Sequence, residues 1–77
     1  MAFIKKLQRI SKDRTSIHDV VNASYTVFNE CGRTIFQIDT YGREDRECVG
    51  KVSQTVQFDK ESARMLIEKL QDVFGLD

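Results

Sequence analysis

Hydrophobic and polar residues alternate with a period of two along three stretches of the chain. In the first of these stretches, polar residues alternate with Val21, Ala23, Tyr25 and Val27. The side chains of a strand point in turn to its two faces, so this alternation predicts a strand with one buried face. The pattern predicts strands over residues 19–29, 34–41 and 50–58.

Residues 3–10 carry a pattern that fits two structures. Their apolar residues at 3, 4, 7 and 10 suit helical spacing about as well as a strand, and we interpret the segment as a strand. Polar residues 11–16 follow it and predict a loop. Residues 29–33 form a short connection that predicts a hairpin, with Gly32 at a positive φ.

The period changes from two to 3.6 after Asp59, which predicts an amphipathic helix over residues 60–74. Asp59 suits the N-cap, and Glu61 places negative charge in the first turn, where the helix dipole favours it. Gly75 suits the C-terminal end of the helix. The apolar stripe consists of Ala63, Leu66, Ile67, Leu70, Val73 and Phe74. Because an apolar stripe needs an apolar partner, we expect it to pack on the sheet.

These elements predict one α+β domain over residues 1–77. The predicted fold is a four-stranded antiparallel sheet followed by one C-terminal amphipathic helix packed on one face (ββββα). A chain of 77 residues is too short to divide its apolar residues between two cores. Domains of this size often gain stability by oligomerisation, so we expect a homodimer. Met65 stands opposite the apolar stripe and is either a lone exposed residue or a dimer contact.

The charge of the chain is balanced overall but uneven along it. Twelve Lys and Arg residues offset twelve Asp and Glu residues, which removes the simplest argument for a nucleic-acid partner. Residues 1–14 hold five basic side chains and one acidic side chain, a net charge of +4. This basic segment either meets phosphate groups or simply keeps an edge strand in solvent.

The N-terminus lacks the apolar core and cleavage site of a secretory signal, and no apolar run approaches the length of a membrane span. We therefore expect a cytoplasmic protein without a membrane partner. Cys31 and Cys48 lack metal-ligand spacing, and we expect both as free thiols in a reducing compartment. The sequence leaves open whether they are ever joined.

The residues that carry catalytic or metal chemistry do not form recognisable constellations. The one histidine, His18, has neither cysteine near it in the sequence and is expected to face solvent from a loop. Glu44, Asp45 and Glu47 are interrupted by arginines and lack the spacing of a calcium loop. The glycines form no phosphate-binding motif. We expect no catalytic residue, no metal, no cofactor, no small-molecule substrate and no enzymatic activity.

The sheet face opposite the helix is the surface that remains for function. It is expected to present Gln37, Tyr41, Lys51, Ser53, Thr55 and Gln57. Amide and hydroxyl groups hydrogen-bond bases, aromatic rings stack on them, and Lys neutralises phosphates, as in sequence-tolerant single-strand binders. The alternative is that this face is simply the solvated side of a two-layer domain.

Residues 50–67, read as Gly-Lys-Val-Ser-Gln-Thr-Val-Gln-Phe-Asp-Lys-Glu-Ser-Ala-Arg-Met-Leu-Ile, join the last strand to the helix. This junction, with its Gly-Lys entry, alternating strand and polar, acidic helix start, resembles the positive cofactor four family of transcriptional coactivators and its bacterial and phage relatives. The resemblance covers residues 34–70, about half the chain.

The resemblance implies a homodimer, joined largely through its C-terminal helices, that binds single-stranded or unwound DNA with low sequence specificity. By position, Lys51, Tyr41, Arg43 and Arg46 would contact the strand. Lys5, Lys6 and Arg9 would add phosphate contacts. Together with the polar face, the predicted nucleic-acid site is Lys5, Lys6, Arg9, Gln37, Tyr41, Arg43, Arg46, Lys51, Ser53 and Thr55.

A second hypothesis comes from another functional class. The neutral charge and the acidic outer face of the helix suit a small protein-interaction module or regulator, such as one encoded by a mobile element. Such a module would dock on another protein through the sheet or through a strand edge.

Overall fold

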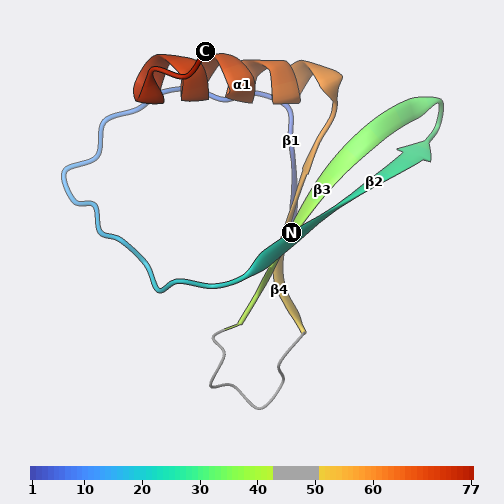
Figure 1. The fold of residues 1–77 in the computed structure, drawn as a ribbon, viewed down its shortest axis with the longest axis horizontal. Helices are drawn as coiled ribbons and strands as arrows, with labels where there is room; N and C mark the ends of the chain where they lie inside the picture. The colour runs from blue at the N-terminus through green and yellow to red at the C-terminus, as the bar shows by residue number, and fades with distance from the viewer. Residues whose placement is uncertain (43–50) are drawn as a thin grey trace.

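The fold is α+β, with four strands followed by one helix in a computed structural model that describes residues 1–42 and 51–77 (Figure 1). The elements in chain order are β1 (Ala2–Ile4), β2 (Ala23–Glu30), β3 (Arg33–Tyr41), β4 (Val52–Phe58) and α1 (Lys60–Phe74). The ββββα order and the range of the helix are those predicted from the hydrophobic pattern.

The four strands form one mixed sheet in the order β1-β4-β3-β2. The β2–β3 and β3–β4 pairs are antiparallel, whereas β1 pairs with β4 in parallel. The prediction of a purely antiparallel sheet is therefore wrong at this edge. A parallel pair needs a long connection between its strands, and no tight turn links β1 to its neighbour.

The first strand is much shorter than the predicted 3–10, and the second begins at Ala23 rather than near residue 19. Residues 5–22 belong to no strand, and all of them except Leu7 are exposed. We call this segment the N-terminal arm. It leaves the sheet at β1 and returns to it at β2 (Figure 1). The apolar residues that suggested longer strands have no strand partner here.

The hairpin between β2 and β3 is confirmed and is a two-residue turn. Glu30 pairs with Arg33, and the two residues between them, Cys31 and Gly32, have φ of 52° and 75°. Two successive positive φ values define a type I′ turn, whose twist matches that of the flanking strands.

The register of β3 against β4 sorts the side chains as the alternation predicts. Phe36 pairs with Phe58 and Ile38 with Val56, so these residues share one face of the sheet. Intervening positions lie on the opposite, mostly polar face.

The helix starts with a capping box that joins it to the sheet. The Ser62 backbone N–H donates to Asp59 Oδ1 at 3.0 Å, and the Asp59 backbone N–H donates to Ser62 Oγ at 3.1 Å. The outer oxygen of the same carboxylate lies 2.9 Å from Lys5 Nζ and 3.7 Å from Arg33 Nη1. Asp59 therefore ties the first turn of α1 to residues at the ends of β1 and β3.

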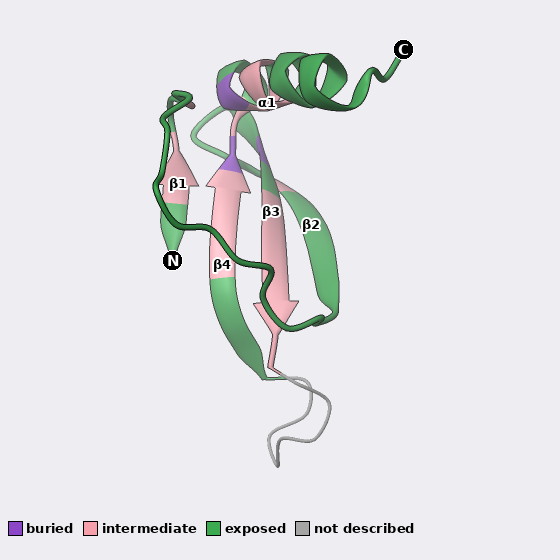
Figure 2. Cartoon of the chain, turned by 90° about the vertical axis from the view of Figure 1, so that its left-hand side faces the viewer, coloured by how far each residue is buried: buried purple, intermediate pink, exposed green. Residues whose placement is uncertain are grey.

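The helix does not lie along the sheet. Its buried and half-buried residues lie between Ser62 and Leu66, and the rest of the helix extends beyond the strands (Figures 1 and 2). Among the described residues, Ile35 and Phe58 are the buried hydrophobic side chains, and Ser62 is the buried polar one. The expectation that the whole apolar stripe packs on the sheet is therefore wrong for its C-terminal half. Among the described residues, no helix is long and apolar enough to cross a membrane.

The capping carboxylate predicts a pH dependence of stability. The Ser62 backbone N–H first, and then the Lys5 ammonium, lower the pKa of Asp59 from 3.8 to about 2. A depressed carboxyl pKa stabilises the fold above the unfolded pKa and loses that effect as the pH falls through the folded one. Thermal melts should therefore show a falling midpoint between pH 4 and pH 2.

The Asp59→Asn variant is the matched control, because Asn retains a capping oxygen but cannot ionise. Its melting midpoint should be lower than that of the wild type at pH 6 and should change less between pH 4 and pH 2. Equal slopes for the two proteins would show that Asp59 does not carry this stabilisation.

Candidate functional site on the polar face of the sheet

A ladder of polar side chains crosses the centre of the sheet on the face opposite Phe36 and Phe58. The register places Gln37 opposite Gln57, and Asp39 opposite Thr55. Gln57 Nε2 donates to Gln37 Oε1 at 2.8 Å, and Gln37 Nε2 lies 3.2 Å from both carboxylate oxygens of Asp39.

The carboxylate of Asp39 is the acceptor on which the ladder converges. Thr55 Oγ1 donates to Asp39 Oδ1 at 2.7 Å, in addition to the contact from Gln37. All of these side chains are partly buried. Bonds to a charged acceptor are stronger than neutral ones, so Asp39 fixes the rotamers of its two donors. The polar face is an ordered arrangement rather than a set of independent solvated groups.

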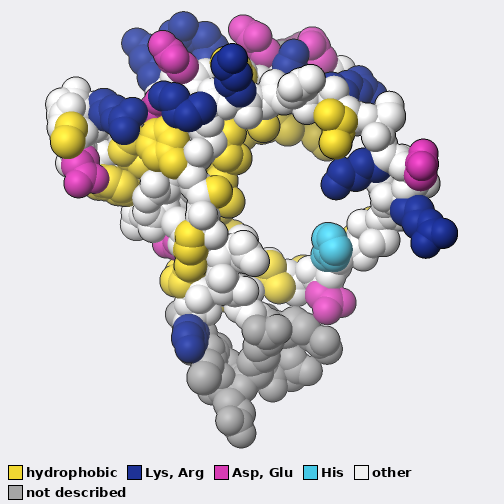
Figure 3. Space-filling model, turned by 180° about the vertical axis from the view of Figure 1, so that it is seen from behind, with side chains coloured by type: hydrophobic (Ala, Val, Ile, Leu, Met, Phe, Trp, Pro, Cys, Tyr) yellow, Lys and Arg dark blue, Asp and Glu magenta, His cyan; other side chains and the backbone are white. Residues whose placement is uncertain are grey.

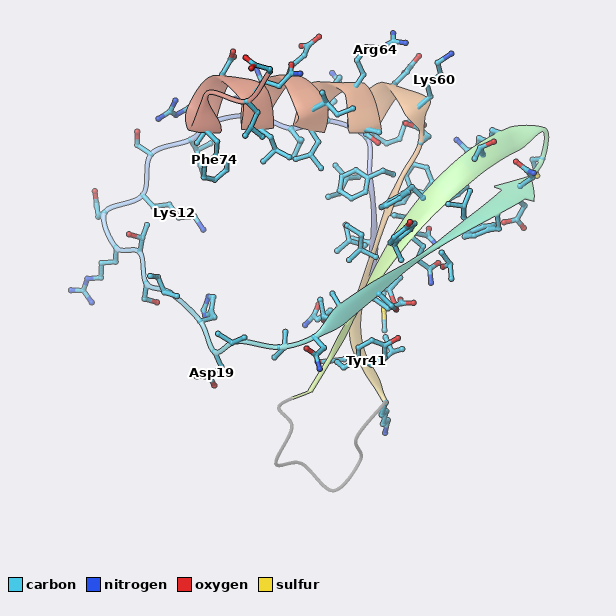
Figure 4. The ribbon with its side chains drawn as sticks, in the orientation of Figure 1. Lys12, Asp19, Tyr41, Lys60, Arg64 and Phe74 are labelled. Carbon is cyan, nitrogen blue, oxygen red and sulfur yellow. The ribbon has the colours of Figure 1, made fainter. Side chains whose placement is uncertain are left out.

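An aromatic residue ends the ladder on the side of the sheet where β3 finishes. Tyr41 Oη and Ser24 Oγ share a hydrogen bond of 2.7 Å across β3 and β2. The β3–β4 register shifts between Thr40 and Tyr41, which breaks the regular pairing at this point. Figure 4 shows Tyr41 near the end of the sheet farthest from α1. The ring is therefore placed at the rim of the polar face and held by its hydroxyl.

A second aromatic residue lies at the other end of the same face, near the helix. Phe3 occupies the β1 position opposite Gln57. Its ring lies 5.6 Å from Lys5 Nζ and 5.1 Å from Arg33 Cζ, measured to the ring centroid. The two cations also meet the carboxylate of Asp59, so their positions are fixed by both the ring and the acid.

The predicted nucleic-acid residues fall into four groups. Gln37, Tyr41, Ser53 and Thr55 share the polar face, and exposed Lys51 lies at its end, just before β4. Lys5 lies at the opposite end. Lys6 and Arg9 belong to the N-terminal arm, away from the ladder. Arg43 and Arg46 lie outside the described residues.

The predicted nucleic-acid site left out four residues that shape this surface. Asp39 and Gln57 complete the ladder, while Phe3 and Arg33 build the cationic end. Alternation places Gln57 and Asp39 on this face, but it does not show that they are hydrogen-bonded to residues of the predicted site. No comparable signal brings Phe3 beside Arg33, because their proximity depends on the parallel pairing of β1.

Other residues singled out from the sequence lie away from this face. His18 lies in the exposed arm, and Cys31 is a free, exposed thiol in the hairpin turn. Cys48, Glu44, Asp45 and Glu47 fall outside the described residues. Met65 is half-buried on the helix. Within residues 1–42 and 51–77, no group of three or more His, Cys, Asp or Glu side chains could hold a metal ion.

Comparison of the chain with protein-family models, with curated proteins and with solved structures finds no match. The resemblance to the positive cofactor four family remains a hypothesis. Any function must therefore be argued from the polar face and the other surfaces of the molecule itself.

The ladder predicts a cost for removing its central acceptor. Asp39→Ala leaves the Gln37 amide and the Thr55 hydroxyl without their shared acceptor, and should lower the free energy of unfolding by about 1–3 kcal/mol. Urea denaturation at a fixed protein concentration measures this change. Asp39→Asn keeps an acceptor oxygen and should lose less. If Asp39→Ala were as stable as the wild type, the ladder would not hold the face together.

Proposed function

We propose that this protein is a non-catalytic binding module that binds single-stranded nucleic acid, with low sequence specificity, on the polar face of the sheet. The observation that carries the proposal is the order of groups along that face. Amide, carboxylate and hydroxyl groups form the centre, and an aromatic ring with at least one cation lies at each end.

The centre of the face offers the groups that recognise base edges. A Gln amide has two N–H donors and an acceptor oxygen, and the ladder uses one N–H of Gln57 for Gln37. The carboxylate of Asp39 can accept further hydrogen bonds from exocyclic amino groups of bases. It also repels phosphate. Bases rather than the sugar–phosphate backbone would therefore face the ladder.

The ends of the face offer stacking and charge. From Gln37 to Tyr41 the strand spans about 13 Å at ~3.3 Å per residue, a length suited to a few nucleotides. Tyr41 at one end gives bases a ring to stack on. Lys51 beside Tyr41, and Lys5 and Arg33 beside Phe3, place positive charge where the backbone would leave the ladder.

Fluorescence anisotropy with a labelled single-stranded oligonucleotide, at low and moderate salt, tests this proposal. Affinity should fall as salt rises, because binding releases counterions from phosphates. Tyr41→Ala should weaken binding by roughly 5- to 150-fold, the cost of about 1–3 kcal/mol for one stacked base. Lys51→Ala should reduce the salt slope by about 0.7, the value for one phosphate contact on a single strand.

Lys69→Ala is the matched control, because it removes the same charge from an exposed position on α1, away from the polar face. It should bind like the wild type. Absence of binding at low salt, or an equal loss in Lys51→Ala and Lys69→Ala, would contradict the proposal.

A separate observation favours a second function, protein association. Large apolar side chains are exposed on the helix, on the sheet and on the arm. Where such side chains gather into a patch, as they do beside the helix (Figure 3), they mark a protein contact rather than a nucleic-acid contact.

A further inference from the structure

The apolar stripe of α1 is uncovered over its C-terminal half. Ile67, Leu70 and Val73 are exposed, and Phe74 is 68% exposed. Figure 4 shows Phe74 pointing from the helix into the open space beside the sheet, whereas Arg64 points away from it. The helix therefore aims its apolar side at a region that the chain itself does not fill.

The apolar face of the sheet is uncovered beside the same space. Tyr25 is 66% exposed and Val27 58% exposed, although they lie beside Ile38 and Phe36 in the β2–β3 register. The rings of Tyr25 and Phe36 stack, with centroids 4.9 Å apart. Figure 3 shows hydrophobic side chains gathered along the rim of a wide opening between the helix and the sheet.

The N-terminal arm closes the third side of this opening (Figures 1 and 3). The arm is longer than the ~12–15 residues beyond which loops without secondary structure are uncommon. Within it, Ile17 is 99% exposed, and Ile10 and Val20 are also exposed. An extended segment that carries isolated apolar residues is suited to lying against another chain.

The overall dimensions show how much surface remains uncovered. The accessible surface is 7090 Å² for 8.9 kDa, about 2,300 Å² more than the ~4,800 Å² of a folded monomer of that mass. Any eight residues expose at most about 1,400 Å², so residues 43–50 cannot account for the difference. The radius of gyration is 14.8 Å, against about 11.5 Å for a compact chain of this length.

We propose that a second copy of this chain occupies the opening, with the α1 stripe of each protomer packed on the apolar sheet face of the other. The N-terminal arms lie along the partner. The arrangement is isologous, since the stripe and the face that it meets are both present on every chain.

The area and the core both favour a second copy over a different protein. The described residues hold between about 900 and about 2,300 Å² of this excess, against about 800 Å² per partner in a standard interface and about 1,000–2,500 Å² per partner in an obligate homodimer. Two buried hydrophobic side chains among the described residues do not make a self-sufficient core. The excess exposed surface must be covered whenever the chain folds, and a second copy is the partner that is always present.

This interface differs from the dimer contact expected at Met65, which lies on the side of the helix opposite the stripe. It also leaves the polar face of the sheet outside the contact, since the opening lies on the apolar face. Dimerisation and nucleic-acid binding are therefore independent and can fail separately.

Sedimentation equilibrium on the purified chain tests the proposal. The wild type should sediment with a mass twice 8.9 kDa, and its melting temperature should rise with protein concentration. Val73→Asp places a charge in the stripe and should lower the dimer affinity at least tenfold, whether the dissociated chain stays folded or unfolds. Gln71→Asp adds the same charge to the same turn outside the stripe and should keep the wild-type mass.

A folded wild type that sediments at 8.9 kDa and melts at a temperature independent of concentration would overturn the proposal and leave the opening to a different protein. A dimer that Val73→Asp does not weaken would overturn it as well, because the contact would then lie elsewhere on the molecule.

Discussion

The arrangement of this molecule depends on the contacts that the carboxylate of Asp59 makes. It caps α1 through Ser62 and meets Lys5 after β1 and Arg33 at the start of β3. Three separate segments are therefore joined at the point where the helix begins. Because this junction lies at one end of the sheet, the helix leaves at its corner and extends past the strands instead of covering them.

This geometry gives the two faces of the sheet different requirements. The side chains of the polar face hydrogen-bond one another: Gln57 donates to Gln37, and both Gln37 and Thr55 donate to Asp39. The apolar face lacks a cover at Tyr25, Val27 and Phe36, as does the C-terminal half of the helix stripe. One face is thus ordered and open to a polar ligand, while the other is completed by the second copy that we propose. The division of roles follows from where Asp59 anchors the helix.

Much of this fold could be predicted from the sequence because strand alternation and helical periodicity are local properties. Phe36, Ile38, Val56 and Phe58 share a face, and α1 spans the predicted residues. The parallel pairing of β1 could not be predicted, because the apolar residues at 3, 4, 7 and 10 fit more than one structure. The pattern of the stripe shows that it must be covered but contains no information on which chain covers it.

The candidate site could be predicted only in part, for the same reason. Alternation places Gln37, Ser53 and Thr55 on one face, but the convergence on Asp39 depends on the β3–β4 register. Likewise, the sequence predicts Lys5 as a phosphate contact, but its ion pair with Asp59 depends on the fold. Contacts between strands distant in the sequence follow from the fold and not from local spacing.

Hydrogen–deuterium exchange on α1 at two protein concentrations, well below and well above the dimer dissociation constant, tests the central claim most directly. Amides near Ser62, anchored by Asp59, should be the last of the helix to lose protection on dilution, whereas amides around Leu70 to Phe74 should be protected only at the higher concentration. Equal, strong protection along the whole helix at both concentrations would contradict the account, because the stripe would then be covered within a single chain.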